Sequence, residues 1–313
     1  MAKGKSIRMF LVDGSPDGIV AAEIMNWTGH LLACSRARLP DLLSRSEVER
    51  TGVYLLTGPD PDVDGKTAVY IGESDSVRQR LISHNKDESK SFWDRACVVT
   101  SKDQNLTKAH VRFLESRLIA TAKKAVGITV SNSTAPDYGY LPEADIADME
   151  FFLEQLGVIL PVLGFEIMRS STGVVTETPS PVETAAPAAG AEQSFELVSS
   201  KHELKASARE IGATFFVLAG SQARAAWVGK PGSYQSLHGQ LLADGTLEAT
   251  QGGHAIFKQD YPFSSPSAAA AVVYGRQDNG RLSWKVPGTG KTYQDWQDEK
   301  IASAAAGKEL EPA

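Results

Sequence analysis

Three side chains that could share one piece of chemistry lie close together early in the chain: Tyr70, Arg80 and His84. Tyr70-Ile71-Gly72 has the pattern of a strand that ends at the glycine, and a helix is expected to follow from Ser76. Residues four apart lie on one face of a helix, so Arg80 and His84 point in the same direction. An arginine binds anionic groups, and a histidine titrates near neutral pH. The pattern therefore predicts a site that holds an anion and moves a proton.

Glu115 belongs to a later helical stretch, in which Val111, Leu114 and Leu118 form an apolar stripe. The carboxylate lies on or beside that stripe, and burying its charge is costly unless a cation meets it. Two partners fit this requirement: an arginine such as Arg80 in a salt bridge, or a metal ion. The residue pattern alone leaves both open.

The elements that position these side chains alternate between short strands and helices. Strands are expected at residues 53–56, 67–71 and 96–100, and the first two form a hairpin with a long loop. One helix follows from Ser76 and a longer one runs over residues 106–124. The fold class expected is α+β.

The ordered set resembles the GIY-YIG nuclease family. Gly52-Val53-Tyr54 matches the first family triplet, with valine in place of isoleucine, and Tyr70-Ile71-Gly72 matches the second. The resemblance covers residues from about Thr51 to Leu141. The positions that match the family's functional residues are Tyr54, Tyr70, Arg80, His84, Glu115 and, in the late asparagine position, Asn132.

The resemblance implies a small three-stranded antiparallel sheet flanked by helices, and a metal-dependent DNA endonuclease that hydrolyses phosphodiester bonds. Glu115 would bind the divalent metal, Mg²⁺ or Mn²⁺, and Arg80 would clamp a phosphate oxygen. Tyrosine is a weak base near neutral pH, with an ordinary pKa of about 10. Our interpretation is that Tyr54 acts as base or relay, while Tyr70 and His84 position water and phosphate; the sequence does not rank the three.

The loop between the two tyrosines is longer than is usual in the family, and it holds Asp60, Asp62 and Asp64. It lacks the glycine and the terminal glutamate of a calcium-binding EF-hand loop. We expect a solvated acidic loop there.

Charge is unevenly distributed along the chain. The formal net charge is −6, yet residues 66–124 carry twelve Lys/Arg against seven Asp/Glu, a local balance of +5. A basic block of this kind suits a phosphate backbone, whereas the acidic stretch that follows does not. DNA is therefore the expected partner, with its structure and sequence preference open.

The two cysteines, Cys34 and Cys97, form no metal or disulfide motif, which indicates buried thiols in a reducing compartment. The apolar run at residues 9–12 is too short for a signal peptide, and the run at 158–163 is too short to cross a bilayer. We expect a cytoplasmic, bacterial protein without a membrane partner.

The expected domain organisation has five parts. The N-terminal part is read as a strand at residues 7–12, a helical stretch over residues 21–25 and a second strand at residues 31–35. The C-terminal region resembles a domain of unknown function that often accompanies the GIY-YIG module in bacteria, chiefly through residues 215–221 and 263–273. The parts are an N-terminal strand and helix extension (1–48), the nuclease-like domain with a helical extension (49–168), a flexible linker (169–194), a C-terminal α+β domain (195–302) and a disordered tail (303–313).

An alternative function remains open. The scaffold could serve as a nucleic-acid or protein binding module with weak or no catalysis. A protein partner for the C-terminal domain is compatible with either function, because that domain carries no readable catalytic spacing.

Overall fold

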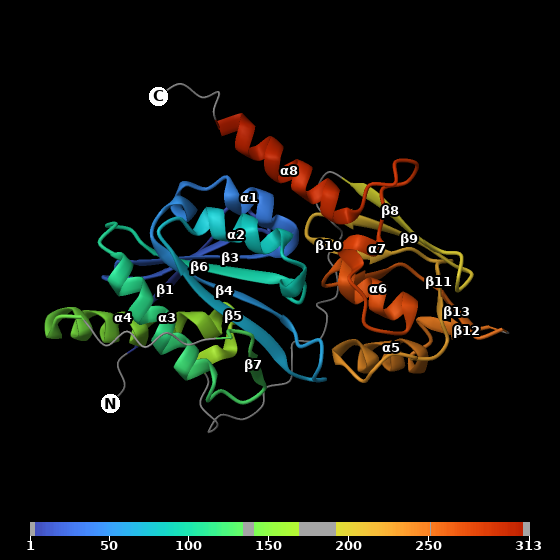
Figure 1. The fold of residues 1–313 in the computed structure, drawn as a ribbon, viewed down its shortest axis with the longest axis horizontal. Coiled ribbons are helices and arrows are strands. Elements are labelled where there is room, and N and C mark those ends of the chain that lie inside the picture. The colour runs from blue at the N-terminus through green and yellow to red at the C-terminus, as the bar shows by residue number, and fades with distance from the viewer. Residues whose placement is uncertain (1–3, 134–140, 169–191, 251, 309–313) are drawn as a thin grey trace. The chain divides into compact units, whose positions relative to one another are not determined.

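The computed structural model describes residues 4–133, 141–168, 192–250 and 252–308. The chain divides into two compact units, Met1–Pro59 with Lys66–Glu177, and Thr178–Ala313 with Asp60–Gly65. Both units combine helices and strands (Figure 1), so the expected α+β class is confirmed. Among the described residues, no helix is both long enough and apolar enough to cross a membrane.

The first unit is built on a seven-stranded sheet with the order β1-β2-β3-β6-β4-β5-β7. Neighbouring strands are antiparallel except β5 and β7, which are parallel. The strands are β1 (Ile7–Leu11), β2 (Val20–Ile24), β3 (Gly29–Ser35), β4 (Gly52–Pro59), β5 (Thr67–Ser74), β6 (Arg95–Ser101) and β7 (Ile128–Val130).

The sheet is wider than the small three-stranded antiparallel sheet that we expected: the strands β6, β4 and β5 are antiparallel neighbours within a sheet of seven. The N-terminal extension adds β1, β2 and β3 to one side. The helix expected over residues 21–25 is wrong, since this stretch lies in β2, which pairs with β1 and β3. Hydrogen bonding to two neighbouring strands outweighs the helix propensity of Ala21-Ala22-Glu23.

Helices cover both faces of this sheet (Figure 1). On one face lie α1 (Leu39–Leu43) and α2 (Val77–Lys86), and on the other lie α3 (Lys108–Ala122) and α4 (Glu143–Val162). Short 3₁₀ turns occupy Arg36–Arg38, Ser46–Glu49, Glu88–Lys90 and Glu166–Met168.

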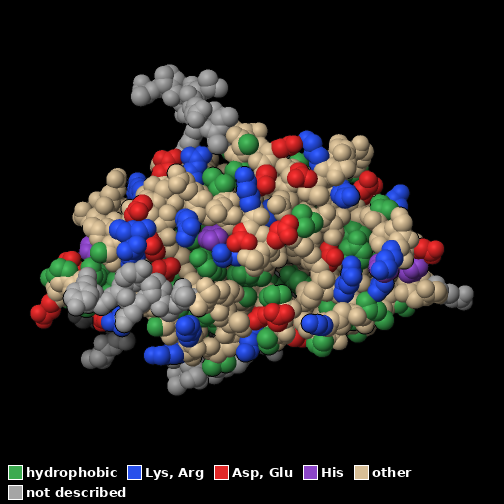
Figure 2. Space-filling view, viewed as in Figure 1, with side chains coloured by type: hydrophobic (Ala, Val, Ile, Leu, Met, Phe, Trp, Pro, Cys, Tyr) green, Lys and Arg blue, Asp and Glu red, His purple; other side chains and the backbone are tan. Residues whose placement is uncertain are grey.

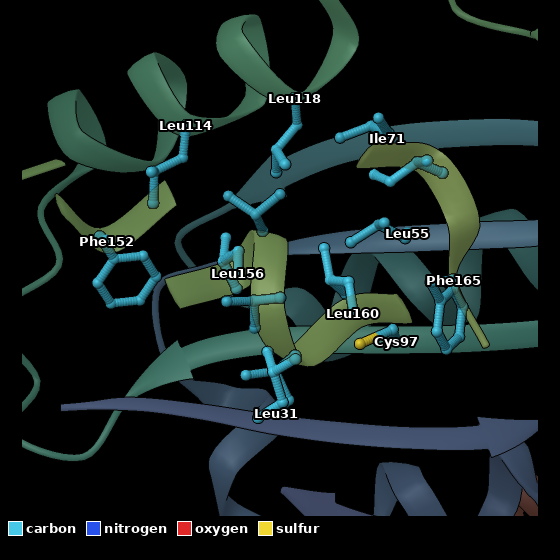
Figure 3. Close-up of a cluster of buried hydrophobic side chains, with 14 of the residues drawn as sticks. Leu31, Leu55, Ile71, Cys97, Leu114, Leu118, Phe152, Leu156, Leu160 and Phe165 are labelled. Atoms are coloured by element: carbon cyan, nitrogen blue, oxygen red, sulfur yellow. The ribbon is translucent and has the colours of Figure 1, made fainter. Parts of the chain in front are cut away.

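The main core of the first unit lies between the sheet and the helices α3 and α4. Leu114 of α3 points toward Phe152 of α4, and Leu118 points into the same cluster as Leu55 of the sheet and Leu156 of α4 (Figure 3). Successive residues of a strand face opposite sides, so the neighbours of these core residues on β4 and β5 face α2 instead. Both tyrosines of the expected site lie on that second face.

The second unit contains two smaller sheets. The first has the order β14-β10-β9-β8 and the second β11-β13-β12. The strands are β8 (Gln193–Ser199), β9 (Leu204–Ile211), β10 (Thr214–Val217), β11 (Gln222–Arg224), β12 (Leu247–Ala249), β13 (His254–Phe257) and β14 (Tyr261–Phe263). The helices are α5 (Ser233–Ala243), α6 (Pro266–Tyr274), α7 (Gly280–Ser283) and α8 (Tyr293–Lys308).

Both ends of the folded part of the second unit lie outside the boundaries that we predicted for the C-terminal domain. Helix α8 continues to Lys308, so a disordered tail from residue 303 is wrong up to that position. Strand β8 begins at Gln193, inside the last part of the expected linker, and residues 169–191 of that linker lie outside the described residues.

Candidate active site

The two tyrosine strands are locked together in a register that pairs Tyr54 with Gly72. A Cβ atom on Gly72 would lie 2.3 Å from the Tyr54 hydroxyl oxygen and 2.5 Å from Cζ. These separations are too short for any side chain. Glycine at this position therefore allows the buried Tyr54 ring to lie directly on the neighbouring strand.

Helix α2 brings His84 to the same point. Val77, Leu81 and His84 are all buried, which shows that this face of the helix packs on the sheet. The Nε2 atom of His84 lies 2.7 Å from the Tyr54 hydroxyl. The ring centroids of Tyr70 and His84 are 4.9 Å apart, with the rings edge to face. Two tyrosines and a histidine thus form one contiguous cluster.

The protonation states within this cluster follow from its burial. Burial, together with the charges of Lys90 and Arg80, lowers the pKa of His84 to about 4, against a smaller opposing effect of Asp87. Burial, with a further contribution from Tyr70, raises the pKa of Tyr54, although Arg80 acts in the opposite direction. At neutral pH the hydrogen bond therefore joins a protonated phenol and a neutral imidazole.

Two cations border the cluster. Arg80 is exposed, and its positive charge acts on the Tyr54 hydroxyl, whereas the Tyr70 ring lies 6.2 Å from the Tyr54 ring between centroids. Lys90 lies with its Nζ atom 4.5 Å from the centroid of the Tyr70 ring, and its ion pair with Asp87 spans 3.3 Å. Lys90 could not be identified from the sequence, because only the 3₁₀ turn after α2 brings it back to the site.

Glu115 lies on α3 and is half-buried. Burial, followed by the charge of Glu73, raises its pKa to about 7, while Lys108, Arg80 and Arg112 oppose that shift. Lys108 Nζ is engaged with Glu73 at 2.7 Å. Within the described part of the chain, Glu115 itself has no hydrogen bond and no ion pair, so the salt bridge to Arg80 that the sequence left open does not form.

This environment suits a hard divalent cation at Glu115. A half-buried carboxylate with no protein partner is stabilised when a cation meets it. The described residues contain no group of three His, Cys, Asp or Glu side chains that could enclose a metal. Magnesium binds through one or two carboxylates and keeps several waters, so a single glutamate is enough for it.

Asn132 uses both polar atoms of its side chain on the backbone of β5. Its Oδ1 accepts a hydrogen bond from the Ile71 amide at 3.0 Å, and its Nδ2 donates to the Ile71 carbonyl at 2.7 Å. Strand β7 pairs with β5 only as far as Val69, and the Asn132 side chain extends that pairing to Ile71. Asn132 therefore positions the strand that carries Tyr70 and Gly72.

The acidic loop between the tyrosines has a local explanation. Asp60 Oδ1 accepts hydrogen bonds from the backbone amides of Asp62 and Val63, at 2.8 and 3.1 Å. Such a turn is the usual role of aspartate in a loop. Asp62 and Asp64 are exposed, as expected of a solvated loop, whereas Asp60 is buried, so the expectation is wrong for that residue.

Comparison with known proteins informs the second unit. No curated protein and no solved structure matches the chain. Residues 196–297 match a family model described as a domain of unknown function, DUF4357. The expectation of a C-terminal domain of unknown function is thereby confirmed, and this stretch of the chain is similar to that family.

Proposed function

We propose that the first unit is a metal-dependent endonuclease of the GIY-YIG type, which hydrolyses phosphodiester bonds in DNA. One observation carries the proposal. The buried Tyr54–His84 hydrogen bond at 2.7 Å, the exposed Arg80 and the unpartnered Glu115 come from β4, α2 and α3 and act on each other electrostatically. A partly buried carboxylate without a partner costs folding free energy, and such a cost is typical of functional sites rather than of residues that serve only the fold.

Each group then has a role that its environment supports. Arg80 is exposed, so it can reach a phosphate oxygen and stabilise the charge that develops in the transition state. Lys90 supplies a second positive charge over Tyr70. Glu115 would hold the magnesium or manganese ion, which when bound polarises the phosphate and lowers the pKa of water.

Proton transfer would start at the more accessible tyrosine. Tyr70 is half-buried, whereas Tyr54 is buried, so Tyr70 is the ring that water can approach. The Tyr54 hydroxyl contacts His84 Nε2, the Tyr70 ring packs against the His84 ring, and His84 is neutral, with a pKa of about 4 that makes it a weak and therefore transient proton acceptor. We assign a relay in which a proton leaves water through Tyr70 and Tyr54 toward His84. In this assignment Tyr54 is a relay, one of the two roles that the sequence left open for it.

The choice of DNA rests on charge. Residues 66–124 hold Arg80, Lys90 and the helices α2 and α3, and their balance is +5 in a chain of net charge −6. A local positive surface around the candidate site favours a phosphate backbone over a neutral substrate.

A cleavage assay tests the proposal. Purified protein would be incubated with branched, single-stranded and duplex DNA and Mg²⁺ or Mn²⁺, at a stated salt concentration. We expect at least one substrate to be cut by the wild type and by Glu154→Gln, a matched control on the exposed side of α4, but not by Glu115→Gln. Full activity of Glu115→Gln would overturn the proposal.

The competing function is a binding module built on the same scaffold. The raised pKa of the buried Tyr54 favours it, because a phenol of that kind is a poor base on its own. The same assay separates the two functions: a binding module retains DNA on a filter or in a gel but cuts none of the substrates with either metal.

A further inference from the structure

A basic depression lies within the second unit, in the part of the chain that matches a domain without an assigned function. The cavity measures about 510 Å³. Its walls are the turn at residues 200–203, the turn at residues 252–254, and Arg224, Ala226 and Val228. Figure 2 shows Lys or Arg and His side chains gathered on the second unit in the region where Figure 1 places β11.

Arg224 is held in this depression by a defined set of contacts. Its Nη2 lies 2.7 Å from Nδ1 of His202. Arginine has only donors, so His202 Nδ1 must be the acceptor and the ring is neutral. The Nε2 atom of His254 lies 3.2 Å from the His202 carbonyl, and Arg224 faces His254 across the β11–β13 pair. These contacts orient the guanidinium without using a carboxylate.

The charge around the cavity is net positive. Among the described residues, neither Lys201 nor Arg224 forms an ion pair, and Arg276 has only a long contact of 3.9 Å with Asp278. The charges of Lys201, Arg224 and Arg276 act together on His202, where burial and these three cations lower the imidazole pKa. Glu203 is the one acidic side chain among the described residues that line the cavity.

The shape and lining of the cavity limit what it can bind. A volume of about 510 Å³ lies within the range of small-ligand sites. The lining residues that the structure describes include no Phe, Tyr or Trp, so nucleobases have no platform on which to stack. Gly252 and Gly253 have positive φ angles of 94° and 82°, and they leave this wall free of side chains. These features favour a sugar-phosphate group over a base.

We infer that this depression binds the phosphate backbone of a nucleic-acid strand, as a contact separate from the candidate active site. Arg224 and Lys201 would each neutralise one phosphate. The choice of nucleic acid as the source of the phosphate rests on the proposed function of the first unit, while the anion-binding chemistry rests on the pocket alone.

DNA binding in the presence of EDTA tests the inference without any cleavage. The anisotropy of a fluorescein-labelled DNA strand would be titrated with full-length protein over a series of salt concentrations. For the Lys201→Gln/Arg224→Gln double variant we expect the Kd to rise by about tenfold or more and the salt slope to fall by about two. Lys285→Gln, an exposed lysine outside the cavity, is the matched control and should change the slope by less than half as much.

Two further variants distinguish a loss of phosphate binding from a loss of the folded structure. Arg224→Lys keeps the charge and should retain most of the affinity, while Glu203→Gln removes the opposing carboxylate and should tighten binding. Unchanged affinity and slope in the double variant would overturn the inference. This result does not bear on the Glu115-dependent cleavage that tests the first unit.

Discussion

The hydroxyl of Tyr54 occupies the most constrained position in the candidate site. It lies on Gly72 of the neighbouring strand and within 2.7 Å of His84 on α2. Any change that moves this hydroxyl alters both the strand pairing and the proton path.

Gly72→Ala tests this constraint. The new methyl group would lie 2.3 Å from the Tyr54 oxygen, so we expect the free energy of unfolding to fall by about 1–3 kcal/mol. Gly157→Ala on α4 is the control, because its Cβ would lie 3.6 Å from the nearest atom, Met168 Cε. That control should be neutral or slightly stabilising. Equal urea midpoints for Gly72→Ala and the wild type would contradict the close approach.

His84 gives a second prediction, on pH. Its folded pKa of about 4 lies below the ordinary value of 6.5, so the unfolded chain binds the proton more readily. The stabilisation is therefore complete above pH 6.5 and is lost as the pH falls toward 4. Between pH 7 and pH 5 this residue should account for about 1–2 kcal/mol of lost stability.

Urea denaturation at both pH values measures this loss. We expect His84→Gln, which lacks the titrating ring, to lose less stability between pH 7 and pH 5 than the wild type. If the two proteins lose the same amount, His84 is not held neutral by its surroundings.

At the scale of elements, strand β5 carries both Tyr70 and Gly72 but is paired by β7 only from Thr67 to Val69. The Asn132 side chain completes the pairing at Ile71 through two hydrogen bonds. The position of the site thus depends on a residue outside the reactive cluster.

Asn132→Ala should cost about 1–3 kcal/mol of unfolding free energy, because the Ile71 amide and carbonyl lose their side-chain partners. Asn105→Ala, at an exposed loop asparagine, should change stability by less than about 0.5 kcal/mol. Thermal melts of the two variants check this. A melt of Asn132→Ala that matches the wild type would show that β5 does not need the amide.

Several elements could be predicted from local pattern. Val53–Leu56 and Thr67–Ile71 read as strands, and β4 and β5 contain them. The stretch from Ser76 reads as a helix, and α2 begins at the next residue, with Ser76 as its N-cap. Residues 20–24 could not be predicted, since their Ala-rich segment favours a helix and only the pairing with β1 and β3 makes it a strand.

The sequence indicated which residues share the candidate site, but not how their side chains contact one another. The order of Tyr54, Tyr70, Arg80 and His84 indicated a shared site, and the fold brings them together. Glu115 has no protein partner because the nearby Lys108 pairs with Glu73 instead. Which carboxylate Lys108 contacts is set by the three-dimensional fold and could not be predicted from the sequence. The cation over Tyr70 likewise depends on a turn after α2, for which the sequence carries no separate signal.

At the scale of the whole molecule, metal binding should appear in global stability. An ion that binds only the folded chain raises the unfolding free energy by about 2.7 kcal/mol at a hundred times its Kd. We expect saturating Mn²⁺ to raise the Tm of the wild type and EDTA to reverse the increase. Glu115→Gln should show neither effect, and an equal increase in this variant would place the ion elsewhere.

If Glu115 serves phosphodiester hydrolysis, removal of its carboxylate should slow the nicking of supercoiled plasmid DNA without weakening DNA binding. The initial rate would be measured with Mg²⁺ for wild type, Glu115→Gln and Glu154→Gln at equal protein concentration, with DNA binding checked in parallel. We expect Glu115→Gln to bind DNA like the wild type but to nick it at least about a hundredfold more slowly, and Glu154→Gln to nick it at the wild-type rate. Nicking by Glu115→Gln at the wild-type rate would contradict a role of Glu115 in hydrolysis.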